Sequence, residues 1–307
     1  MAALPSAQIH PSARVHPSAV IEPGAVLGER VQVGPHALIG TGVTIGDGSE
    51  VGAGARVLGP TRIGRDNRIF PNACLGFEPQ DLKFQGEEVH LEVGDRNQFR
   101  EFCTVHRGTS KGGGVTRIGS DNLFMVYTHV AHDCQVGNRV VFANNATLAG
   151  HVEVLDDATI SAFTSVHQFC RVGRHAYVGA YTVVVMDALP FVKTVGQKAT
   201  CYGVNTIGLR RKGFEPEAVR RLEQAYRILV RSRLNTTQAL ARLRAELGGS
   251  SEHPEHPEHP EISELIAFVE SAKRGVHKSP PERGQGGRGV AGQAEQPDLI
   301  ETPEAEV

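Results

Sequence analysis

The chain has 307 residues with a formal net charge of −2, no Trp and only 6% aromatic residues. The near-neutral charge gives no reason to expect a nucleic acid or an anionic membrane as a partner. Without an apolar run of membrane-spanning length or a secretion signal, we expect a cytoplasmic protein with no stable membrane insertion. Five cysteines in a long chain favour a reducing compartment over a disulfide framework.

Aliphatic residues, with an occasional Phe, recur at every sixth position from Ile9 to Leu75 and again from Ile118 to Val184. Hexapeptide repeats of this kind are typical of a parallel β-helix, in which each repeat buries its face against its neighbours. We therefore predict an all-β solenoid over residues 1–190. Three hexads form one triangular coil, so residues 18 apart stack at roughly 4.8 Å. The low aromatic content predicts a narrow core without large rings.

Two segments interrupt the repeat, residues 76–92 and residues 106–117. An insertion in a solenoid must bulge outward as a loop, and such loops often carry function. A neutral surface insertion is equally compatible with the Gly-rich second loop. The first loop contains Phe77, Leu82 and Phe84, which would be costly to leave in water.

Residues 191–275 are predicted to form a C-terminal cap and helical domain. Helices are expected to begin near Pro216, to cover about 236–247 and to cover 262–272. Between the last two lies a His-Pro-Glu repeat near 252–261, which is typical of a low-complexity linker. Residues 276–307, rich in Gly, Pro and Glu, are predicted to be disordered.

Repeat arithmetic gathers several histidines at one edge of the prism. His132 occupies the third position of its hexad, and Gly150 and Gln168 follow at intervals of 18. We expect these three residues to form a column along one edge. Asp133, His151 and His167 should lie beside it.

This group of residues predicts acyl transfer to a hydroxyl. His132 can act as a general base, with Asp133 orienting it. Gly150 has no side chain, so its backbone N–H can approach a developing oxyanion closely. No Ser-based nucleophile motif is evident, which favours direct attack without an acyl-enzyme.

A zinc site is the main alternative at this position. His129 and His132 lie three residues apart with Cys134 nearby, a combination that resembles zinc ligands. However, Cys134 should point into the core, and strand alternation places His129 and His132 on different sides of Val130. We therefore predict no metal and no cofactor, with a zinc-dependent β-helix hydratase as the alternative.

Two charged segments have both functional and structural interpretations. The run from Arg210 to Lys212 could bind a diphosphate or be a solvated surface. Asp81 and Lys83 in the first loop could contact a substrate or form a surface ion pair.

Several motifs resemble the UDP-N-acetylglucosamine O-acyltransferase family of lipid A biosynthesis. The similarity covers roughly residues 9 to 275. It implies a left-handed parallel β-helix, a homotrimer with sites between subunits, and metal-free transfer of an (R)-3-hydroxyacyl group from acyl carrier protein to the 3-hydroxyl of UDP-N-acetylglucosamine. The motifs are Gln80-Asp81-Leu82-Lys83, Ile118-Gly119-Ser120-Asp121-Asn122, Ala131-His132-Asp133-Cys134, the segment from Ala143 to His151, Val166-His167-Gln168-Phe169 and Gly203-Val204-Asn205.

The resemblance implies roles for individual residues. His132 is the general base, Asp133 its partner and Gly150 the oxyanion donor. The residues implied to line the substrate pockets are Asp81, Lys83, His129, His151, His167, Gln168 and Asn205, with Arg211 and Lys212 near the diphosphate or the carrier protein. Ala180 aligns with a position that limits the acyl tunnel. Ile207 and Lys198 depart from the acidic residue and the His expected at their positions.

Two further alternatives concern function. The related N-acyltransferase of the same pathway carries a uridine-binding domain before its β-helix, whereas hexads here begin at Ile9. A non-catalytic scaffold is the second alternative, and the intact pair of His132 and Asp133 together with Gly150 argues against it.

Overall fold

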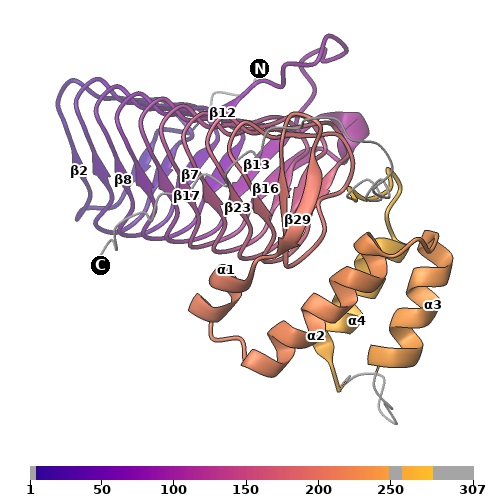
Figure 1. Ribbon diagram of the computed structural model, residues 1–307. Helices are drawn as coiled ribbons and strands as arrows, with labels where there is room; N and C mark the ends of the chain where they lie inside the picture. The colour runs from indigo at the N-terminus through magenta and orange to yellow at the C-terminus, as the bar shows by residue number, and fades with distance from the viewer. Residues whose placement is uncertain (1–4, 249–257, 279–307) are drawn as a thin grey trace, which may run out of the picture.

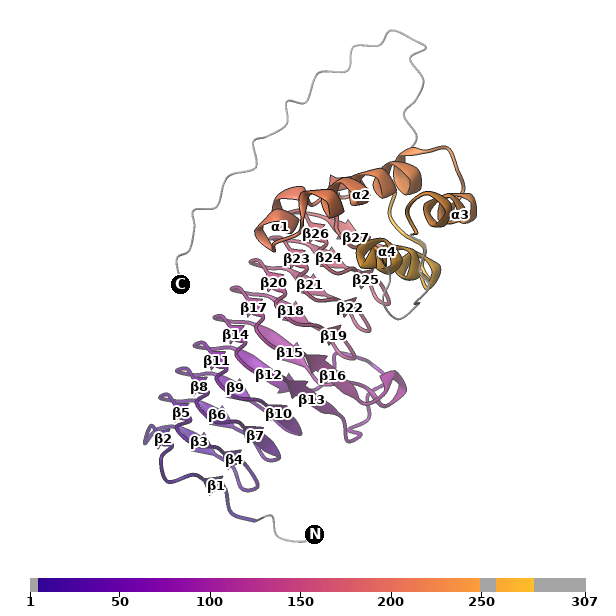
Figure 2. The same ribbon diagram turned by 90° about the horizontal axis from the view of Figure 1, so that it is seen from below.

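The computed structural model describes residues 5–248 and 258–278. These residues form a prism of stacked coils with helices packed at its C-terminal end (Figures 1 and 2). The predicted fold class, a left-handed parallel β-helix of hexapeptide repeats with a small helical domain, is confirmed.

Three sheets form the sides of the prism within the described residues. The first sheet contains, in spatial order, β1 (Gln8–Ile9), β4 (Val26–Leu27), β7 (Val43–Ile45), β10 (Thr61–Ile63), β13 (His90–Val93), β16 (Val115–Ile118), β19 (Gln135–Val136), β22 (Glu153–Val154) and β25 (Arg171–Val172). The second contains β2 (Arg14–Val15), β5 (Gln32–Val33), β8 (Glu50–Val51), β11 (Arg68–Ile69), β14 (Gln98–Phe99), β17 (Leu123–Phe124), β20 (Val141–Phe142), β23 (Thr159–Ile160), β26 (Tyr177–Val178), β28 (Val192–Val195) and β29 (Thr200–Val204). The third contains β3 (Val20–Ile21), β6 (Leu38–Ile39), β9 (Arg56–Val57), β12 (Cys74–Phe77), β15 (Thr104–His106), β18 (His129–Val130), β21 (Thr147–Leu148), β24 (Ser165–Val166) and β27 (Val183–Val184).

The strand register follows the predicted 18-residue spacing. Ile9 pairs with Leu27, and Val130 pairs with Leu148. The interior is filled by aliphatic side chains, but three rings also lie there. Phe99, Phe124 and Phe142 are fully buried and stack with centroids 4.8 Å apart. The expectation of a core without large rings was therefore wrong, because identical stacking from coil to coil lets flat rings share the narrow interior.

The corners of the prism use left-handed backbone at the fourth hexad position. Asp133 and His151 both have φ of 61°. Glycines at the second position serve a different purpose, since a Cβ added at Gly46 would lie 2.6 Å from the backbone of Gly64 in the next coil. These close approaches explain why the coils can stack at strand spacing.

Both loops leave the prism where the third sheet passes to the first, which we call the loop edge. The first loop runs between β12 and β13 (residues 78–89) and the second between β15 and β16 (residues 107–114), slightly shorter than the predicted segments. The second loop contains the short helix η1 (Ser110–Gly112). Leu82 at the tip of the first loop is fully exposed in this chain, whereas Phe77 and Phe84 are half-buried.

The strand pairing continues past residue 190, the predicted end of the β-helix. β28 pairs in parallel with β26, and β29 returns antiparallel to it. The helices that follow are α1 (Thr206–Arg211), α2 (Pro216–Tyr226), the π-helix η2 (Arg227–Arg231), α3 (Thr236–Leu247) and α4 (Pro260–Glu270). Neither the β28–β29 hairpin nor α1 was predicted from the sequence, whereas α2 begins at Pro216 as expected.

Two boundaries near the C-terminus differ from the prediction. Most of the His-Pro-Glu repeat lies outside the described residues, but its end belongs to α4, where buried Glu261 pairs with Arg221 at 2.9 Å. The segment predicted to be disordered begins with ordered residues, because the N–H of His277 donates to the carbonyl of Asp187 at 3.0 Å. Residues 279–307 lie outside the described part of the chain.

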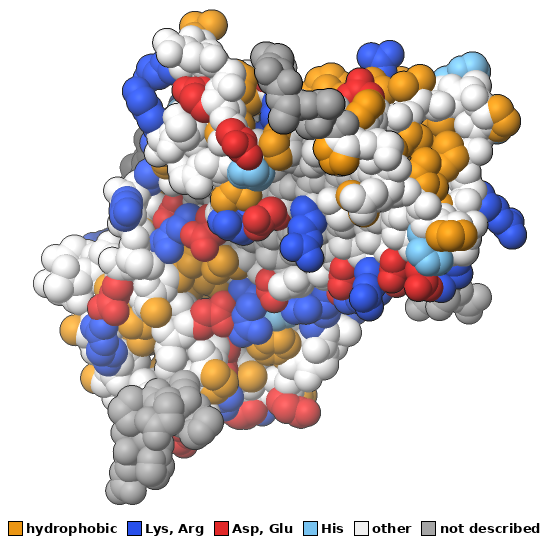
Figure 3. All heavy atoms as spheres, turned by 180° about the vertical axis from the view of Figure 1, so that it is seen from behind, with side chains coloured by type: hydrophobic (Ala, Val, Ile, Leu, Met, Phe, Trp, Pro, Cys, Tyr) orange, Lys and Arg blue, Asp and Glu red, His pale blue; other side chains and the backbone are white. Residues whose placement is uncertain are grey.

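The surface carries charges of both signs. Acidic and basic side chains lie intermixed over the face shown in Figure 3. Many pair between neighbouring coils, as Arg117 does with Glu92 at 2.9 Å. Among the described helices, none is long and apolar enough to cross a bilayer.

Candidate active site

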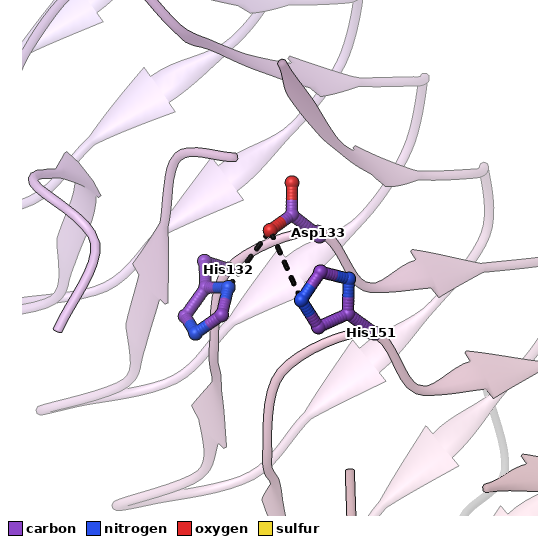
Figure 4. A group of neighbouring side chains, drawn as sticks. All are labelled: His132, Asp133 and His151. Carbon is purple, nitrogen blue, oxygen red and sulfur yellow. Dashed lines mark hydrogen bonds and ion pairs between the residues drawn. The ribbon is translucent and has the colours of Figure 1, made fainter. Parts of the chain in front are cut away.

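His132 and Asp133 form a buried pair at the loop edge (Figure 4). Nδ1 of His132 lies 2.8 Å from Oδ2 of Asp133, with side-chain exposures of 10% and 0%. Both residues follow β18, where the chain turns from the third sheet toward the first. The corner backbone of Asp133 directs its carboxylate back beneath the second loop, since Thr109 of that loop contacts it.

The carboxylate of Asp133 is held by several donors. The N–H of Thr109 donates to Oδ1 at 2.8 Å, and the hydroxyl of Thr109 donates to Oδ2 at 2.7 Å. The N–H of Asp133 itself donates to the hydroxyl of buried Thr116 at 2.8 Å. The carboxylate of Asp133 thus accepts two hydrogen bonds from Thr109, and its Oδ2 also faces the imidazole of His132.

This arrangement determines which ring nitrogen of His132 carries the proton. Because Asp133 is an acceptor, Nδ1 of His132 must be the donor, and neutral His132 then presents an unprotonated Nε2. A neutral imidazole with this tautomer can remove a proton from a substrate at Nε2. The carboxylate also stabilises the imidazolium that results.

Gly150 lies against the ring of His132, as the repeat arithmetic predicted. A Cβ added at Gly150 would lie 2.5 Å from Cε1 of His132. Within the described residues the Gly150 N–H has no hydrogen-bond partner, while its carbonyl accepts from Phe169 at 3.3 Å. The glycine therefore leaves both a free N–H and space for the imidazole.

His151 forms the second contact of Asp133. Its Nε2 lies 3.6 Å from Oδ2, and its ring is stacked on Phe169 with centroids 4.5 Å apart. Burial lowers the pKa of His151 and His132 adds to this effect, whereas Asp133 and Asp81 oppose it. The lowered pKa favours the neutral form of His151, which lies on the more exposed side of the pair of His132 and Asp133.

Two further histidines lie near this site. Nδ1 of His129 lies 2.7 Å from the hydroxyl of Thr104, and its ring meets that of His106 edge-on at 5.1 Å. Burial lowers the pKa of His129, helped by the charge of His132. Burial lowers the pKa of His106 to about 4, with His129 and His132 acting in the same direction. The lowered pKa values favour the neutral forms of both rings.

The zinc set considered from the sequence does not form. Cys134 is buried in the core, where burial raises its pKa to about 12, and its thiol donates to the carbonyl of Ala149. A different group, His132, Asp133 and His151, has ligand atoms within 4.8 Å of one another. Both oxygens of Asp133 already accept hydrogen bonds from Thr109, and Oδ2 also lies 2.8 Å from Nδ1 of His132, whereas Nε2 of His151 lies 3.6 Å away.

The remaining predicted residues occupy three different edges of the prism. His167 and Gln168 are exposed at the loop edge, and Asp81 accepts from the N–H of Lys83 within the first loop. Ala180 is exposed on the edge between the second and third sheets. The structure of one chain therefore does not bring Ala180 to His132.

The third edge, between the first and second sheets, carries the C-terminal group. Asn205 caps α1 and its amide donates to the carbonyl of His175 at 3.1 Å. Arg211 is exposed in α1, whereas Lys212 pairs with Asp157 at 2.9 Å. Ile207 is exposed in α1. Lys198 is exposed in the turn between β28 and β29, which lies at the edge that carries Ala180, since the N–H of Val183 donates to the carbonyl of Gly196.

Sequence reasoning missed Thr109, Thr116 and Phe169. Phe169 lies 18 residues after His151, so the repeat spacing contained the signal for its stacking. Nothing in the spacing indicated Thr109, because it lies in a loop outside the repeat. Two grooves, one of about 780 Å³ that includes Arg14 and Phe70 and one of about 590 Å³ that includes Arg117, lie on outer sheet faces and do not include His132.

Known proteins resemble this chain over most of its length. Residues 187–277 match the second domain of UDP-N-acetylglucosamine O-acyltransferase, and residues 24–59 and 116–150 match the bacterial transferase hexapeptide family. An acyl-[acyl-carrier-protein]–UDP-N-acetylglucosamine O-acyltransferase from Herminiimonas arsenicoxydans is 45% identical over 213 residues, 69% of this chain and 79% of that protein. The chain belongs to the UDP-N-acetylglucosamine O-acyltransferase family.

Solved structures of this family have the same architecture. The UDP-N-acetylglucosamine acyltransferase from Campylobacter jejuni is 35% identical, with a TM-score of 0.80 over 87% of this chain and 100% of that chain. The one from Bacteroides fragilis is 39% identical, with a TM-score of 0.78 over 88% of this chain and 100% of that chain. The resemblance inferred from the motifs is thus confirmed, and the chain is an acyltransferase of the hexapeptide-repeat class.

Proposed function

We propose that this protein transfers an (R)-3-hydroxyacyl group from acyl carrier protein to the 3-hydroxyl of UDP-N-acetylglucosamine, the first step of lipid A biosynthesis. The observation that carries the proposal is the relay of Thr109, Asp133 and His132 beside the free N–H of Gly150. Relatives 45% identical are named acyl-[acyl-carrier-protein]–UDP-N-acetylglucosamine O-acyltransferase, which supports the donor, the acceptor and the type of transfer.

In the proposed mechanism, Nε2 of His132 removes the proton of the sugar 3-hydroxyl as the oxygen attacks the thioester carbonyl. The new C–O bond forms a tetrahedral oxyanion, which the N–H of Gly150 stabilises. Collapse breaks the C–S bond, and the imidazolium of His132 returns its proton to the departing thiolate. Asp133 keeps its hydrogen bond to Nδ1 of His132 and stabilises the imidazolium.

The other residues bind the two substrates in this proposal. Those nearest the relay, His129 and His151 with the first-loop pair Asp81 and Lys83, contact the sugar, and His167 and Gln168 lie at the mouth of the site. Asn205 and Arg211 contact the nucleotide end, and Ala180 limits the acyl chain. Because these groups lie on different edges of one chain, the proposal includes a homotrimer in which edges of neighbouring subunits meet.

The test is mass spectrometry of the product formed from UDP-N-acetylglucosamine and a mixture of hydroxyacyl carrier proteins. We expect one ester at the 3-hydroxyl, and turnover abolished by His132→Ala in a variant that still folds, as circular dichroism would verify. Turnover that survives His132→Ala would refute the assignment of the base. The reaction is proposed to need no metal, so loss of activity on dialysis against a chelator, restored by zinc, would contradict that part.

A further inference from the structure

The second loop reaches back across the loop edge and contacts the buried carboxylate of Asp133. Thr109 supplies two donors to it, one to each oxygen, and Thr109 is itself only 6% exposed. The loop departs from the hexapeptide repeat at this one corner, next to the pair of His132 and Asp133. A surface insertion without a function would not need these contacts with Asp133. They therefore indicate that the second loop supports the pair of His132 and Asp133.

The hydroxyl of Thr109 has a defined direction. Its oxygen accepts from the N–H of Gly112 at 3.2 Å, so its single proton points to Oδ2 of Asp133. The same Oδ2 accepts from Nδ1 of His132. The chain of donors thus runs from Gly112 through Thr109 to the oxygen that orients His132.

Gly112 contributes through its lack of a side chain. A Cβ at this position would overlap the carboxylate of Asp133, the closest neighbour of Gly112 on that side. The N–H of Gly112 also donates to a second acceptor, the carbonyl of Thr109, at 3.0 Å. The loop backbone therefore lies directly over the carboxylate and leaves it no room to move away from His132.

We propose that Thr109 and Gly112 are positioning residues that hold Asp133 in the orientation required to keep the proton of His132 on Nδ1. The inference deepens the proposed acyl transfer and rests on it for its kinetic consequence. Its structural consequence, a fixed Nδ1–H donor on His132, is independent of any substrate.

Thr109→Val removes the hydroxyl while keeping the backbone donor and the shape of the side chain. We expect kcat to fall by about tenfold to a hundredfold, because small misplacements of catalytic groups have effects of this size. The downfield proton resonance of Nδ1–H on His132, assigned by its loss in His132→Ala, should move upfield or broaden. Thr109→Ser should restore both, and the control Ser110→Ala, an exposed neighbour in the same turn, should change neither.

Gly112→Ala provides an independent variant and should lose the same resonance. The proposal is overturned if Thr109→Val keeps both the resonance and turnover, or if Thr109→Ser fails to recover them, which would indicate that the hydroxyl is not what holds Asp133. If the wild type transfers no acyl group but the resonance responds as described, the acyl-transfer proposal fails and the positioning role stands.

Discussion

The ammonium of Lys212 lies 2.9 Å from Oδ1 of Asp157, and Arg139 holds the other oxygen of that carboxylate at 2.8 Å. Asp157 belongs to the β-helix, whereas Lys212 forms the end of α1. Burial alone would raise the pKa of Asp157, but hydrogen bonds from Arg139 and Lys212 lower it to about 2. The group therefore fastens the start of the helical domain to the coils, which gives Lys212 a structural partner within its own chain.

We predict that Asp157→Asn lowers the free energy of unfolding more than Lys212→Gln does. The first variant leaves two cations facing a neutral amide and should cost roughly 2 kcal/mol. The second removes a half-exposed partner while Arg139 remains, and should cost less than about 1 kcal/mol. Urea unfolding at neutral pH measures both losses, and equal losses would contradict the prediction.

The same carboxylate makes stability depend on pH at the acid end. Because the pKa of Asp157 is lowered, its contribution to the free energy of unfolding is complete above roughly pH 3.9 and is lost as the pH falls toward 2.

His175 should make the free energy of unfolding depend on pH in a higher range than Asp157 does. It is 6% exposed, packs against Phe191 and Phe214, and burial lowers its pKa to about 4 against the opposing charge of Asp157. The unfolded chain binds this proton near pH 6.5, so the contribution to stability is full above that value and declines as the pH falls toward 4. We predict that His175→Gln is less stable at pH 7.5 but loses less stability than the wild type between pH 7.5 and 5. Parallel pH dependences in urea titrations would count against this role.

The periodic part of the molecule was predictable because each hexad is a local unit with one inward position. The spacing of 18 therefore placed Gly150 against His132 before any coordinates were known. The loop residue Thr109 was not predictable, since its contact with Asp133 depends on how an aperiodic segment folds back. Two elements of the predicted C-terminal cap were missed for a similar reason. The β28–β29 hairpin and α1 are defined by pairing with the last coil and by the cap at Asn205, which leave no period in the sequence.

Gly150→Ala tests the close approach at the imidazole. The added Cβ would lie 2.5 Å from Cε1 of His132, so the ring must move away from its position over Asp133. We predict that kcat falls by about a hundredfold, while thermal unfolding changes little because the site lies at a corner. The Nδ1–H resonance of His132 provides the control, because movement of the ring away from Asp133 should shift or broaden it in Gly150→Ala. A loss of kcat with an unchanged resonance would mean that Gly150 acts independently of the position of His132.

Ala180→Gly tests whether this corner limits the acyl chain. Ala180 is exposed on the edge between the second and third sheets, so its methyl group projects from the prism. If that edge meets the active site of a neighbouring subunit, removing the methyl group lengthens the space available to the acyl chain. We predict a preference shifted toward longer donors, by up to about tenfold in relative kcat/KM, since one methylene in an apolar pocket is worth tenfold or more. Competition among hydroxyacyl carrier proteins of graded length measures the shift. Ala162, one coil earlier at the same edge, gives the matched control, and an identical response of Ala162→Gly and Ala180→Gly, or none in either, would remove Ala180 from the acyl site.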